Sequence, residues 1–324
     1  MIIVQTPLRV SLFGGGTDFP SYFLEQGGCV LSTAIDKYIF VTIKKRFDKK
    51  LRVGYTKTEM VDCLDDIQHE LIREALRLAN ITHGIEITTM GDIPSEGSGL
   101  GSSSTVTVGA LHAMYAYLGQ LPSAERLAQE ACLIELDILQ APIGIQDQYI
   151  AAYGGLCFIE FTKKNEVEIN RLNLGDQAQR IIDNNLMLFY TGVTRQASTI
   201  LQEQKHNIKD RYAVLNEMKD IAYVARSELL AGNVDAIGPL LHESWLLKKK
   251  LASQISNNHL DDLYQVARKA GATGGKISGA GGGGFLLLYC PYERQYSVRE
   301  ALGLQELSFK NSMDGTKVIF NYHR

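Results

Sequence analysis

Glycine is concentrated in three short windows of this chain, and these windows constrain its fold more than any other feature. Eleven of the 30 glycines fall at 14–16, at Gly97, Gly99 and Gly101, and at Gly279 with 281–284. Glycine weakens helices and strands, because it loses more conformational freedom on folding than other residues. We therefore expect tight turns, or backbone that lies directly against a ligand, at all three windows.

The composition excludes several classes of protein. Of the 324 residues, 45% are hydrophobic and 21% are charged, which predicts an ordered globular fold and excludes a mostly disordered chain. The net charge of −3 does not suit a general polyanion binder, so we expect no nucleic-acid partner. The longest clean apolar run, 285–290, is too short for a membrane span, and the N-terminal sequence has no secretory signal.

The cysteine pattern indicates a reducing compartment. The five cysteines are odd in number and widely scattered, without a Cys-x-x-Cys spacing, and they are Cys29, Cys63, Cys132, Cys157 and Cys290. The seven histidines form no His-x-x-x-His pair. We therefore expect a cytoplasmic protein with free thiols and without a structural metal site.

Hydrophobic patterning predicts two α+β units, in each of which strands are followed by helices. The polar residues 183–185 precede a new apolar strand, so we place the domain boundary there and expect domains at 1–183 and 184–324. Strands are predicted at 2–4, 9–13, 38–44, 84–90, 157–161, 186–190, 284–289 and 317–321. Helices are predicted at 66–79, at 102–118, after Ser123 as N-cap, at 195–230 and at 234–255.

The second glycine window, within the segment 94–105, indicates a phosphate-binding loop. Three alternate glycines, three serines and then a helix present several backbone N–H groups in a concave nest at a positive helix end. The serine hydroxyls can add hydrogen bonds or a ligand for Mg²⁺. The alternative is a flexible linker, but the segment lies between firm strand and helix patterns. A Walker motif is excluded, because Gly275-Lys276 is followed by isoleucine.

The third window, 276–285, also indicates close approach of the backbone, because four consecutive glycines exceed what a tight hairpin uses. A loose loop is the alternative. Gly279, Gly281 and Gly284 match Gly-x-Gly-x-x-Gly, but a strand follows where a dinucleotide-binding fold requires a helix.

Two acidic residues stand out by position. Glu135 falls in the middle of the apolar arc of the helix that starts after Ser123, and a buried carboxylate there requires a cation partner. An arginine and a bound Mg²⁺ are both open at this point. Asp147, twelve residues further on, lies in a polar stretch of otherwise apolar sequence, and is either a turn residue or a general base.

Three ordered segments together resemble the GHMP kinase superfamily, which comprises the galacto-, homoserine, mevalonate and phosphomevalonate kinases. The segments are 7–18, 94–104 and 276–285, and they span nearly the whole chain. The resemblance implies an α+β fold of two domains, an N-terminal ribosomal-protein-S5-like domain and a C-terminal ferredoxin-like α/β sandwich, with the active site in the cleft between them. Segments that resemble the sugar-phosphate branch of the superfamily are 14–20, 31–38, 146–149 and 190–195.

The resemblance also implies roles for single residues. Asp147 matches the catalytic aspartate and Arg9 the arginine near the transferred phosphate, while Ser103 shares Mg²⁺ with Glu135. The implied ATP-binding residues are Gly97, Ser98, Gly99, Leu100, Gly101, Ser102, Ser103, Ser104, Gly281 and Gly282, and the implied substrate-binding residues are Gly15, Gly16, Thr17, Asp18, Asp36, Lys37 and Arg195. Galactokinases carry Glu-His where this chain has Gly15-Gly16, so galactose is not the expected substrate.

The activity that the resemblance implies is ATP-dependent phosphorylation of the anomeric hydroxyl of a sugar phosphate. ATP and Mg²⁺ are the implied cofactors, and a monomer or a homodimer is the expected assembly. Lys37 and Arg195 are alternative cations for the phosphate of the substrate, and an exposed surface charge is the other reading of each. A kinase for another sugar, such as fucose, and a non-catalytic sugar and ATP sensor stay open as alternatives.

Overall fold

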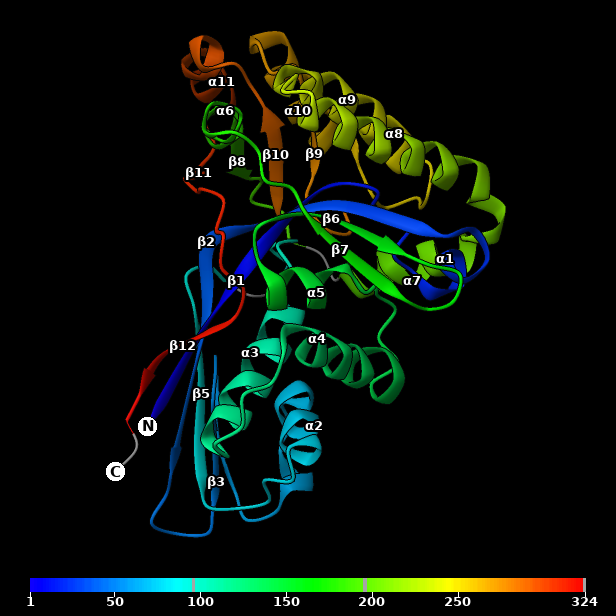
Figure 1. Cartoon of the computed structure of the whole chain (residues 1–324). Coiled ribbons are helices and arrows are strands. Elements are labelled where there is room, and N and C mark those ends of the chain that lie inside the picture. The colour runs from blue at the N-terminus through cyan, green and yellow to red at the C-terminus, as the bar shows by residue number, and fades with distance from the viewer. Residues whose placement is uncertain (95–96, 195–196, 323–324) are drawn as a thin grey trace.

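Two β-sheets organise the computed structural model, which describes residues 1–94, 97–194 and 197–322 (Figure 1). The larger sheet has the strand order β12-β1-β2-β5-β3-β4, and β6 and β7 extend it from β2. The smaller sheet has the order β11-β8-β10-β9. The strands are β1 (Ile2–Phe13), β2 (Gly28–Lys45), β3 (Leu51–Gly54), β4 (Thr58–Val61), β5 (Ile85–Gly91), β6 (Leu156–Phe161), β7 (Val167–Arg171), β8 (Leu186–Tyr190), β9 (Gly274–Ile277), β10 (Phe285–Tyr289), β11 (Glu306–Leu307) and β12 (Lys317–Asn321). The predicted α+β class is confirmed.

Strand β1 runs through Pro7 without a break, so the two short strands predicted on either side of this proline are one element. Pro7 faces Tyr38 on β2, whereas Leu8 already faces Ile35, which leaves residues 36–37 of β2 as a bulge. A bulge at this point lets the strand continue past a residue that cannot donate a hydrogen bond to the ladder.

Helices cover one face of the larger sheet (Figure 1). Helix α3 (Ser102–Tyr117) packs on β1 and β2 with nearly all of its side chains buried, close to the predicted range. Around it lie α2 (Glu70–Leu78), α4 (Ala124–Cys132), the π-helical segment η2 (Leu133–Ile138) and α5 (Gln146–Tyr153). The predicted N-cap of α4 is confirmed, because the Ser123 hydroxyl accepts a hydrogen bond from the backbone N–H of Arg126.

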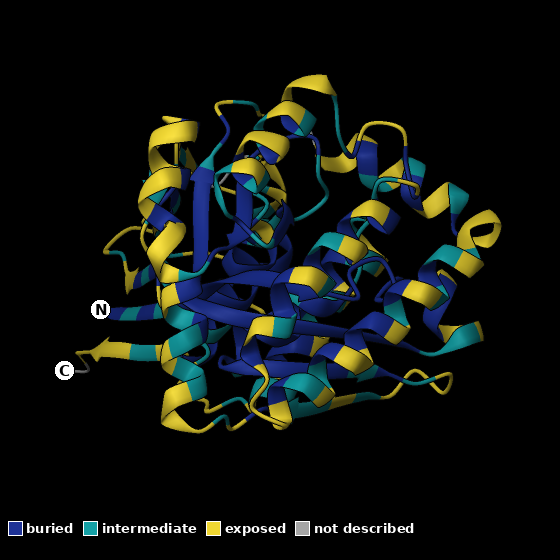
Figure 2. Ribbon diagram, turned by 90° about the horizontal axis from the view of Figure 1, so that it is seen from above, coloured by how far each residue is buried: buried dark blue, intermediate teal, exposed yellow. Residues whose placement is uncertain are grey.

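The remaining helices are α1 (Pro20–Gln26), α6 (Asp176–Asn185), α7 (Ala197–Asn207), α8 (Tyr212–Leu230), α9 (Ile237–Lys248), α10 (Asn258–Ala270) and α11 (Gln295–Leu302). Most of these helices surround the smaller sheet, and α8 also reaches β1 and β2. Each turns a buried side inward and an exposed side to solvent (Figure 2). The apolar faces of these amphipathic helices thus pack into the same hydrophobic core as the strands of both sheets.

Three predicted helices are shorter than expected. The helix predicted at 66–79 starts at Glu70, because the His69 side chain accepts the hydrogen bond from Ile72 N–H that caps it. The stretch predicted at 195–230 is divided into α7 and α8 by a 3-10 turn, Lys209–Arg211. The stretch predicted at 234–255 contains a 3-10 turn, Val234–Ala236, followed by α9. The predicted helices were too long because the spacing of apolar residues continues through these short turns and does not mark where a helix ends.

The end of the chain returns to the larger sheet. Strand β12 pairs antiparallel with β1, and Ile35 forms a bridge with Asn311. Strand β8 starts at Leu186, as predicted, and opens the smaller sheet. Residues 317–321, which the sequence assigned to the second domain, therefore complete the sheet of the first, because strand pairing joins segments irrespective of their order in the chain.

Candidate active site

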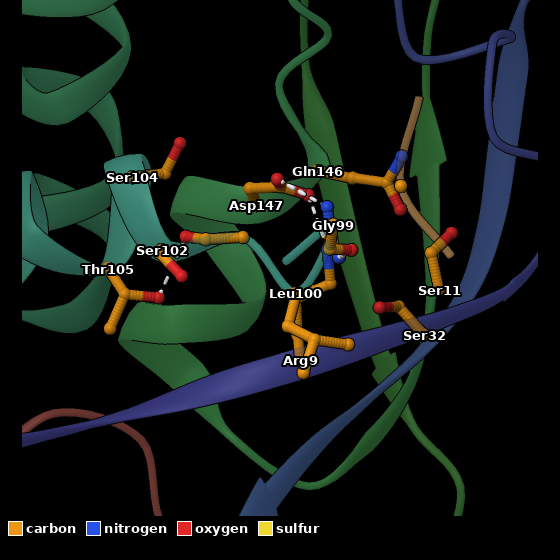
Figure 3. A network of polar contacts seen from close by, with 12 residues as sticks. Arg9, Ser11, Ser32, Gly99, Leu100, Ser102, Ser104, Thr105, Gln146 and Asp147 are labelled. Carbon is orange, nitrogen blue, oxygen red and sulfur yellow. Dashed lines mark hydrogen bonds and ion pairs between the residues drawn. The ribbon is translucent and has the colours of Figure 1, made fainter. Parts of the chain in front are cut away.

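An ion pair between Arg9 and Asp147 forms the centre of the site (Figure 3). Arg9 projects from β1, and Asp147 lies in the first turn of α5. The guanidinium donates from Nε to Oδ1 of Asp147 at 2.7 Å and from NH2 to Oδ2 at 2.6 Å. This bidentate geometry fixes the orientation of both side chains.

Arg9 also holds the second glycine window. Its NH1 atom donates to the carbonyl of Gly99 at 2.6 Å, and its backbone N–H donates to the carbonyl of Leu100 at 3.0 Å. At Gly101 an added Cβ would lie 3.3 Å from Oδ2 of Asp147, and φ is +80°. Glycine therefore lets the loop pass directly beside the ion pair.

The second window opens into α3 and lines a cavity of about 380 Å³, which we call the phosphate cavity. Seven of the eight predicted loop residues line it, and they are Gly97, Ser98, Gly99, Gly101, Ser102, Ser103 and Ser104. Leu100 is different, because it is fully buried and contributes its carbonyl to Arg9. A helix N-terminus with small residues at this cavity is a site for an anion.

The third window touches the second. An added Cβ on Gly99 would lie 2.6 Å from the carbonyl oxygen of Ser278, and one on Gly279 would lie 2.6 Å from Cα of Gly99. Gly279 and Ala280 line the phosphate cavity. The predicted Gly281 and Gly282 do not line it, because they pack on Ile255, whose carbonyl accepts the Gly282 N–H at 2.8 Å.

A second cavity lies on the other side of the ion pair, and we call it the acceptor cavity. Its lining includes Arg9, Ser11, Gly15, Gly16, Asp18, Gln146, Asp147, Gln204, Lys248 and Gly279. Arg9, Asp147 and Gly279 line both cavities. In Figure 3, Ser102 and Ser104 lie on one side of the ion pair, and Ser11 and Gln146 lie on the other. The ion pair thus stands where the two cavities meet.

Asp18 is the second carboxylate of the acceptor cavity. Its Oδ1 accepts the Gly16 N–H at 2.8 Å, and its Oδ2 accepts the Gln146 amide at 2.9 Å. Burial raises its pKa above the usual value, and the nearby Asp147 acts in the same direction. Gly144 is required beside it, because an added Cβ would lie 2.0 Å from Oδ2 of Asp18.

Other predicted substrate residues lie elsewhere. The Thr17 hydroxyl donates to the carbonyls of Gly14 and Cys29, so Thr17 stabilises the turn and does not line the acceptor cavity. Asp36 and Lys37 form the bulge opposite Pro7, pair with each other at 3.2 Å and line neither cavity. Arg195 lies outside the described residues. The order of residues in the sequence could not show that Asp36 and Lys37 fall in a bulge and line neither cavity.

Glu135 is buried beneath the phosphate cavity, with 1% of its surface exposed. Its carboxylate accepts hydrogen bonds from Ser104, Thr107 and Gln148. No arginine or lysine of the described residues pairs with it, and burial is the main cause that raises its pKa to about 7. Of the two cation partners that the sequence left open for Glu135, an arginine is therefore not found within this part of the chain.

The Glu135 pocket fits Mg²⁺ in its chemistry. Carboxylate and hydroxyl oxygens are the hard ligands that this ion prefers, and it commonly shares them with phosphate oxygens and water. The buried carboxylate has no cation of its own, and Asp147 adds to the negative potential. The predicted partner Ser103 lines the phosphate cavity, whereas the hydroxyl that directly contacts Glu135 belongs to Ser104.

Sequence patterns missed two buried lysines, of which Lys248 lines the acceptor cavity and Lys276 contacts Ser11, which also lines it. Lys248 belongs to a run of three lysines, which normally indicates a solvated face, yet its side chain is buried and its Nζ donates to the carbonyl of Gly279. Lys276 is buried too, and its Nζ donates to the carbonyls of Ser11 and Leu12. Only the position of Lys276 at the start of the third window could have drawn attention to it.

A third cavity, of about 560 Å³, adjoins the phosphate cavity. His69 and Val106 line both cavities. The other side chains around it are largely apolar or aromatic, among them Ile39, Tyr55, Met90, Ile93 and Pro94. A flat aromatic ring fits such walls.

The profile of the GHMP kinases N terminal domain matches residues 66–155, and that of the GHMP kinases C terminal domain matches residues 225–306. The chain is 31% identical to a D-glycero-alpha-D-manno-heptose 7-phosphate kinase of Campylobacter jejuni over 319 residues, which cover 93% of each chain. The chain belongs to the GHMP kinases. The predicted family is therefore confirmed.

Two further relatives extend this assignment. The structure of a D-glycero-D-manno-heptose 1-phosphate kinase from Bacteriodes thetaiotaomicron superimposes on this GHMP kinase with a TM-score of 0.84, at 26% identity and with all of both chains covered. A bifunctional fucokinase/GDP-fucose pyrophosphorylase of Arabidopsis thaliana is 26% identical, over 92% of this chain and 31% of its own length. This GHMP kinase is a sugar kinase, a phosphotransferase whose family implies ATP as the phosphate donor. None of the helices in its described part is long and apolar enough to cross a membrane.

Proposed function

We propose that this GHMP kinase transfers the γ-phosphate of ATP to the anomeric hydroxyl of D-glycero-D-manno-heptose 7-phosphate and forms the 1,7-bisphosphate. The observation that carries the proposal is the Arg9–Asp147 ion pair at the junction of the phosphate and acceptor cavities. Phosphoryl transfer is catalysed mainly by positioning and by charge stabilisation, and both require such a junction.

ATP binds with its phosphates along the loop 97–104 and with its base in the adjoining apolar cavity. Backbone N–H groups at the start of α3 hold the phosphate oxygens. Gly279 and Ala280 close the phosphate cavity from the third window. The contact between Gly99 and Gly279 supports this arrangement, because side chains on either would separate the two loops.

Ser103 and Glu135 are the residues that would hold Mg²⁺ in this enzyme. The ion neutralises charge on the phosphate oxygens when it is bound. The Ser104 and Thr107 hydroxyls orient the Glu135 carboxylate from the helix that carries the loop. The Gln148 amide holds it from α5, next to Asp147.

Asp147 accepts the proton of the attacking sugar hydroxyl, and Arg9 stabilises negative charge on the phosphoryl group in transfer. Both oxygens of Asp147 bind Arg9, so the pair also keeps the base in one orientation. Asp18, together with Gln146, holds hydroxyl groups of the sugar. Their hydrogen bonds to each other and to the first window support this role.

A second candidate is a kinase for L-fucose or another sugar, which the likeness to the Arabidopsis enzyme favours. Galactose is disfavoured, because Gly15 and Gly16 line the acceptor cavity and bring no side chain to grip it.

The experiment is a panel of free and phosphorylated sugars assayed with ATP and Mg²⁺, with the product identified by ³¹P NMR. Heptose 7-phosphate is expected to give the highest kcat/KM and a new phosphate on C1. Turnover that is highest with free fucose would favour the second candidate. Nucleotide binding without transfer to any sugar of the panel would favour a non-catalytic sensor.

A further inference from the structure

Lys248 is a buried cation in the acceptor cavity. It is the last residue of α9, and 5% of its surface is exposed. Its Nζ donates to the carbonyl of Gly279, in the third window. Lys248 lines the acceptor cavity, but it is not among the residues that line the phosphate cavity.

The charge of Lys248 is not neutralised by the chain. No carboxylate of the described residues forms an ion pair with it, whereas Arg9 is bound to both oxygens of Asp147. Burial lowers its pKa to about 8, and Arg9 acts in the same direction, while Asp18 and Asp147 oppose them from a distance. A buried ammonium group without a partner is unfavourable, so a bound anion would stabilise it.

Two polar atoms of the same cavity also lack partners. Within the described residues, neither Ser11 Oγ nor Gln146 Oε1 takes part in a hydrogen bond, although both atoms are buried. Both residues line the acceptor cavity, and Figure 3 shows them on the same side of the ion pair. Buried polar atoms in proteins are normally paired, which indicates that a polar ligand completes this cavity.

Lys276 contacts the backbone of Ser11, which lines the acceptor cavity, but it does not line the cavity itself. It is buried, and its Nζ is bound to the carbonyls of Ser11 and Leu12. Lys248 lies near enough to lower its pKa further. Among the described residues, the cations that line the acceptor cavity are Arg9 and Lys248, and its carboxylates are Asp18 and Asp147. Arg9 is paired with Asp147, whereas Lys248 forms no ion pair there.

We propose that Lys248 binds the phosphate group that the acceptor sugar already carries, and that the Ser11 hydroxyl donates a second hydrogen bond to it. This inference rests on the proposed function, because it takes the acceptor to be a sugar phosphate. Arg9, which lines both cavities, serves the phosphoryl group in transfer, and Lys248, which lines one, serves the acceptor. Lys248, which lines the acceptor cavity, replaces Lys37 as the proposed cation, because Lys37 pairs with Asp36 and does not line this cavity.

The test compares Lys248→Met and Lys248→Gln with the parent, each on heptose 7-phosphate and on the same heptose without phosphate. A charged hydrogen bond predicts that each variant loses about 30- to 100-fold in kcat/KM on the phosphorylated sugar, through KM. On the free sugar each should stay within about threefold of the parent, and kcat should change little on either. Lys250→Met is the matched control, because Lys250 is exposed in the turn that follows α9.

Three outcomes would overturn the inference. An equal fall in kcat on both sugars would place Lys248 on the transferred phosphoryl group instead. Unchanged kinetics on the phosphorylated sugar would remove Lys248 from phosphate binding. A loss of activity that a lowered melting temperature accompanies in Lys248→Met and also in Lys248→Gln would assign it a structural role, since removal of an unpaired buried charge is expected to leave stability unchanged or higher.

Calorimetric titration with heptose 7-phosphate, without ATP, separates this inference from the proposed function. The parent is expected to bind, and the two Lys248 variants are expected to bind about 30-fold more weakly or worse. If the parent binds in this way but transfers phosphate to no sugar, the proposed function fails and the phosphate site stands. If the parent does not bind the sugar phosphate, or the variants bind it equally well, the phosphate site fails.

Discussion

Asp147 and Glu135 are two carboxylates near the same loop, Asp147 beside Gly101 and Glu135 bound to Ser104, and they differ in how their charge is compensated. Asp147 is bound by the guanidinium of Arg9 at two atoms, with a distance of 2.6 Å for the shorter bond. Among the described residues, Glu135 is bound by the neutral donors Ser104, Thr107 and Gln148 alone, and its pKa is raised to about 7. Arg9 thus neutralises the charge of Asp147, whereas no cation of the described residues neutralises that of Glu135, which is left for a ligand.

The same distinction separates the two cations of the acceptor cavity. Arg9 has a carboxylate partner, whereas Lys248 donates to the carbonyl of Gly279 and forms no ion pair within the described part of the chain. A fold that pairs Arg9 with Asp147 and leaves Glu135 and Lys248 without an ion pair among the described residues is suited to hold a cation with the donor and an anion with the acceptor. Substitutions at these positions can distinguish the charges that are paired within the chain from those that we expect a ligand to neutralise.

The largest effect is expected for Asp147→Asn. Loss of a general base predicts that kcat falls about 10²- to 10⁴-fold, while nucleotide affinity stays near that of the parent. A coupled kinase assay measures the first quantity and calorimetry with an ATP analogue the second. Turnover within a few-fold of the parent would show that Asp147 is not the base.

Glu135→Gln is expected to have the next largest effect. It removes the carboxylate proposed for Mg²⁺, so the magnesium concentration for half-maximal turnover should rise on the order of tenfold or more. Magnesium titration of the initial rate measures it. Glu130→Gln is the control, because Glu130 binds Arg126 and Tyr115 on the surface of α4. Superimposable titration curves for parent and Glu135→Gln would exclude Glu135 from the metal site.

The raised pKa of Glu135 predicts a pH-dependent stability of the magnesium-free enzyme. The usual value is 4.5 and the folded protein raises it to about 7, so the native state holds this proton more tightly than the unfolded state. This contribution to the free energy of unfolding is fully present below pH 4.5, falls as pH rises and is lost above pH 7. Its size is about 3 kcal/mol as an upper limit.

Unfolding by denaturant in the presence of a chelator, at several values between pH 5 and pH 8, gives the free energy of unfolding of the parent and of Glu135→Gln. The difference between the two free energies measures this contribution. The variant is expected to gain stability relative to the parent as pH rises. Added Mg²⁺ at pH 8 should then stabilise the parent and leave the variant nearly unchanged. A difference that does not vary with pH would show that the carboxylate is compensated by another group.

Lys37→Met is expected to have the smallest effect. Lys37 pairs with Asp36 at the bulge, partly exposed to solvent, so kcat/KM for heptose 7-phosphate should change less than about twofold. Steady-state kinetics with both heptoses measures it. A loss confined to the phosphorylated sugar would restore Lys37 as its phosphate-binding cation and would contradict the role assigned to Lys248.

Local patterns predicted the parts of the site that are continuous in the chain. The alternate glycines and serines of 97–104 predicted a loop into α3, and seven of those eight residues line the phosphate cavity. Glycine windows and capping residues act through nearby backbone geometry, so a short stretch of sequence contains the cause. Gly281 and Gly282, which the resemblance assigned to ATP, do not line the phosphate cavity, because which glycines of a run face the cavity depends on the packing against Ile255. Their contact with ATP stays a prediction.

The sequence by itself determined the two α+β units, the family and the loop that faces the phosphate cavity. Only the tertiary structure decided which charges find partners. Arg9 meets Asp147 across 138 residues, and Glu135 meets hydroxyl groups instead of an arginine. Lys248 is buried at the acceptor cavity, while Lys37 pairs with Asp36 and does not line it. The physical reason is that charge compensation depends on distance and burial, which are set by segments far apart in the chain, whereas helices, turns and caps follow from neighbours in sequence.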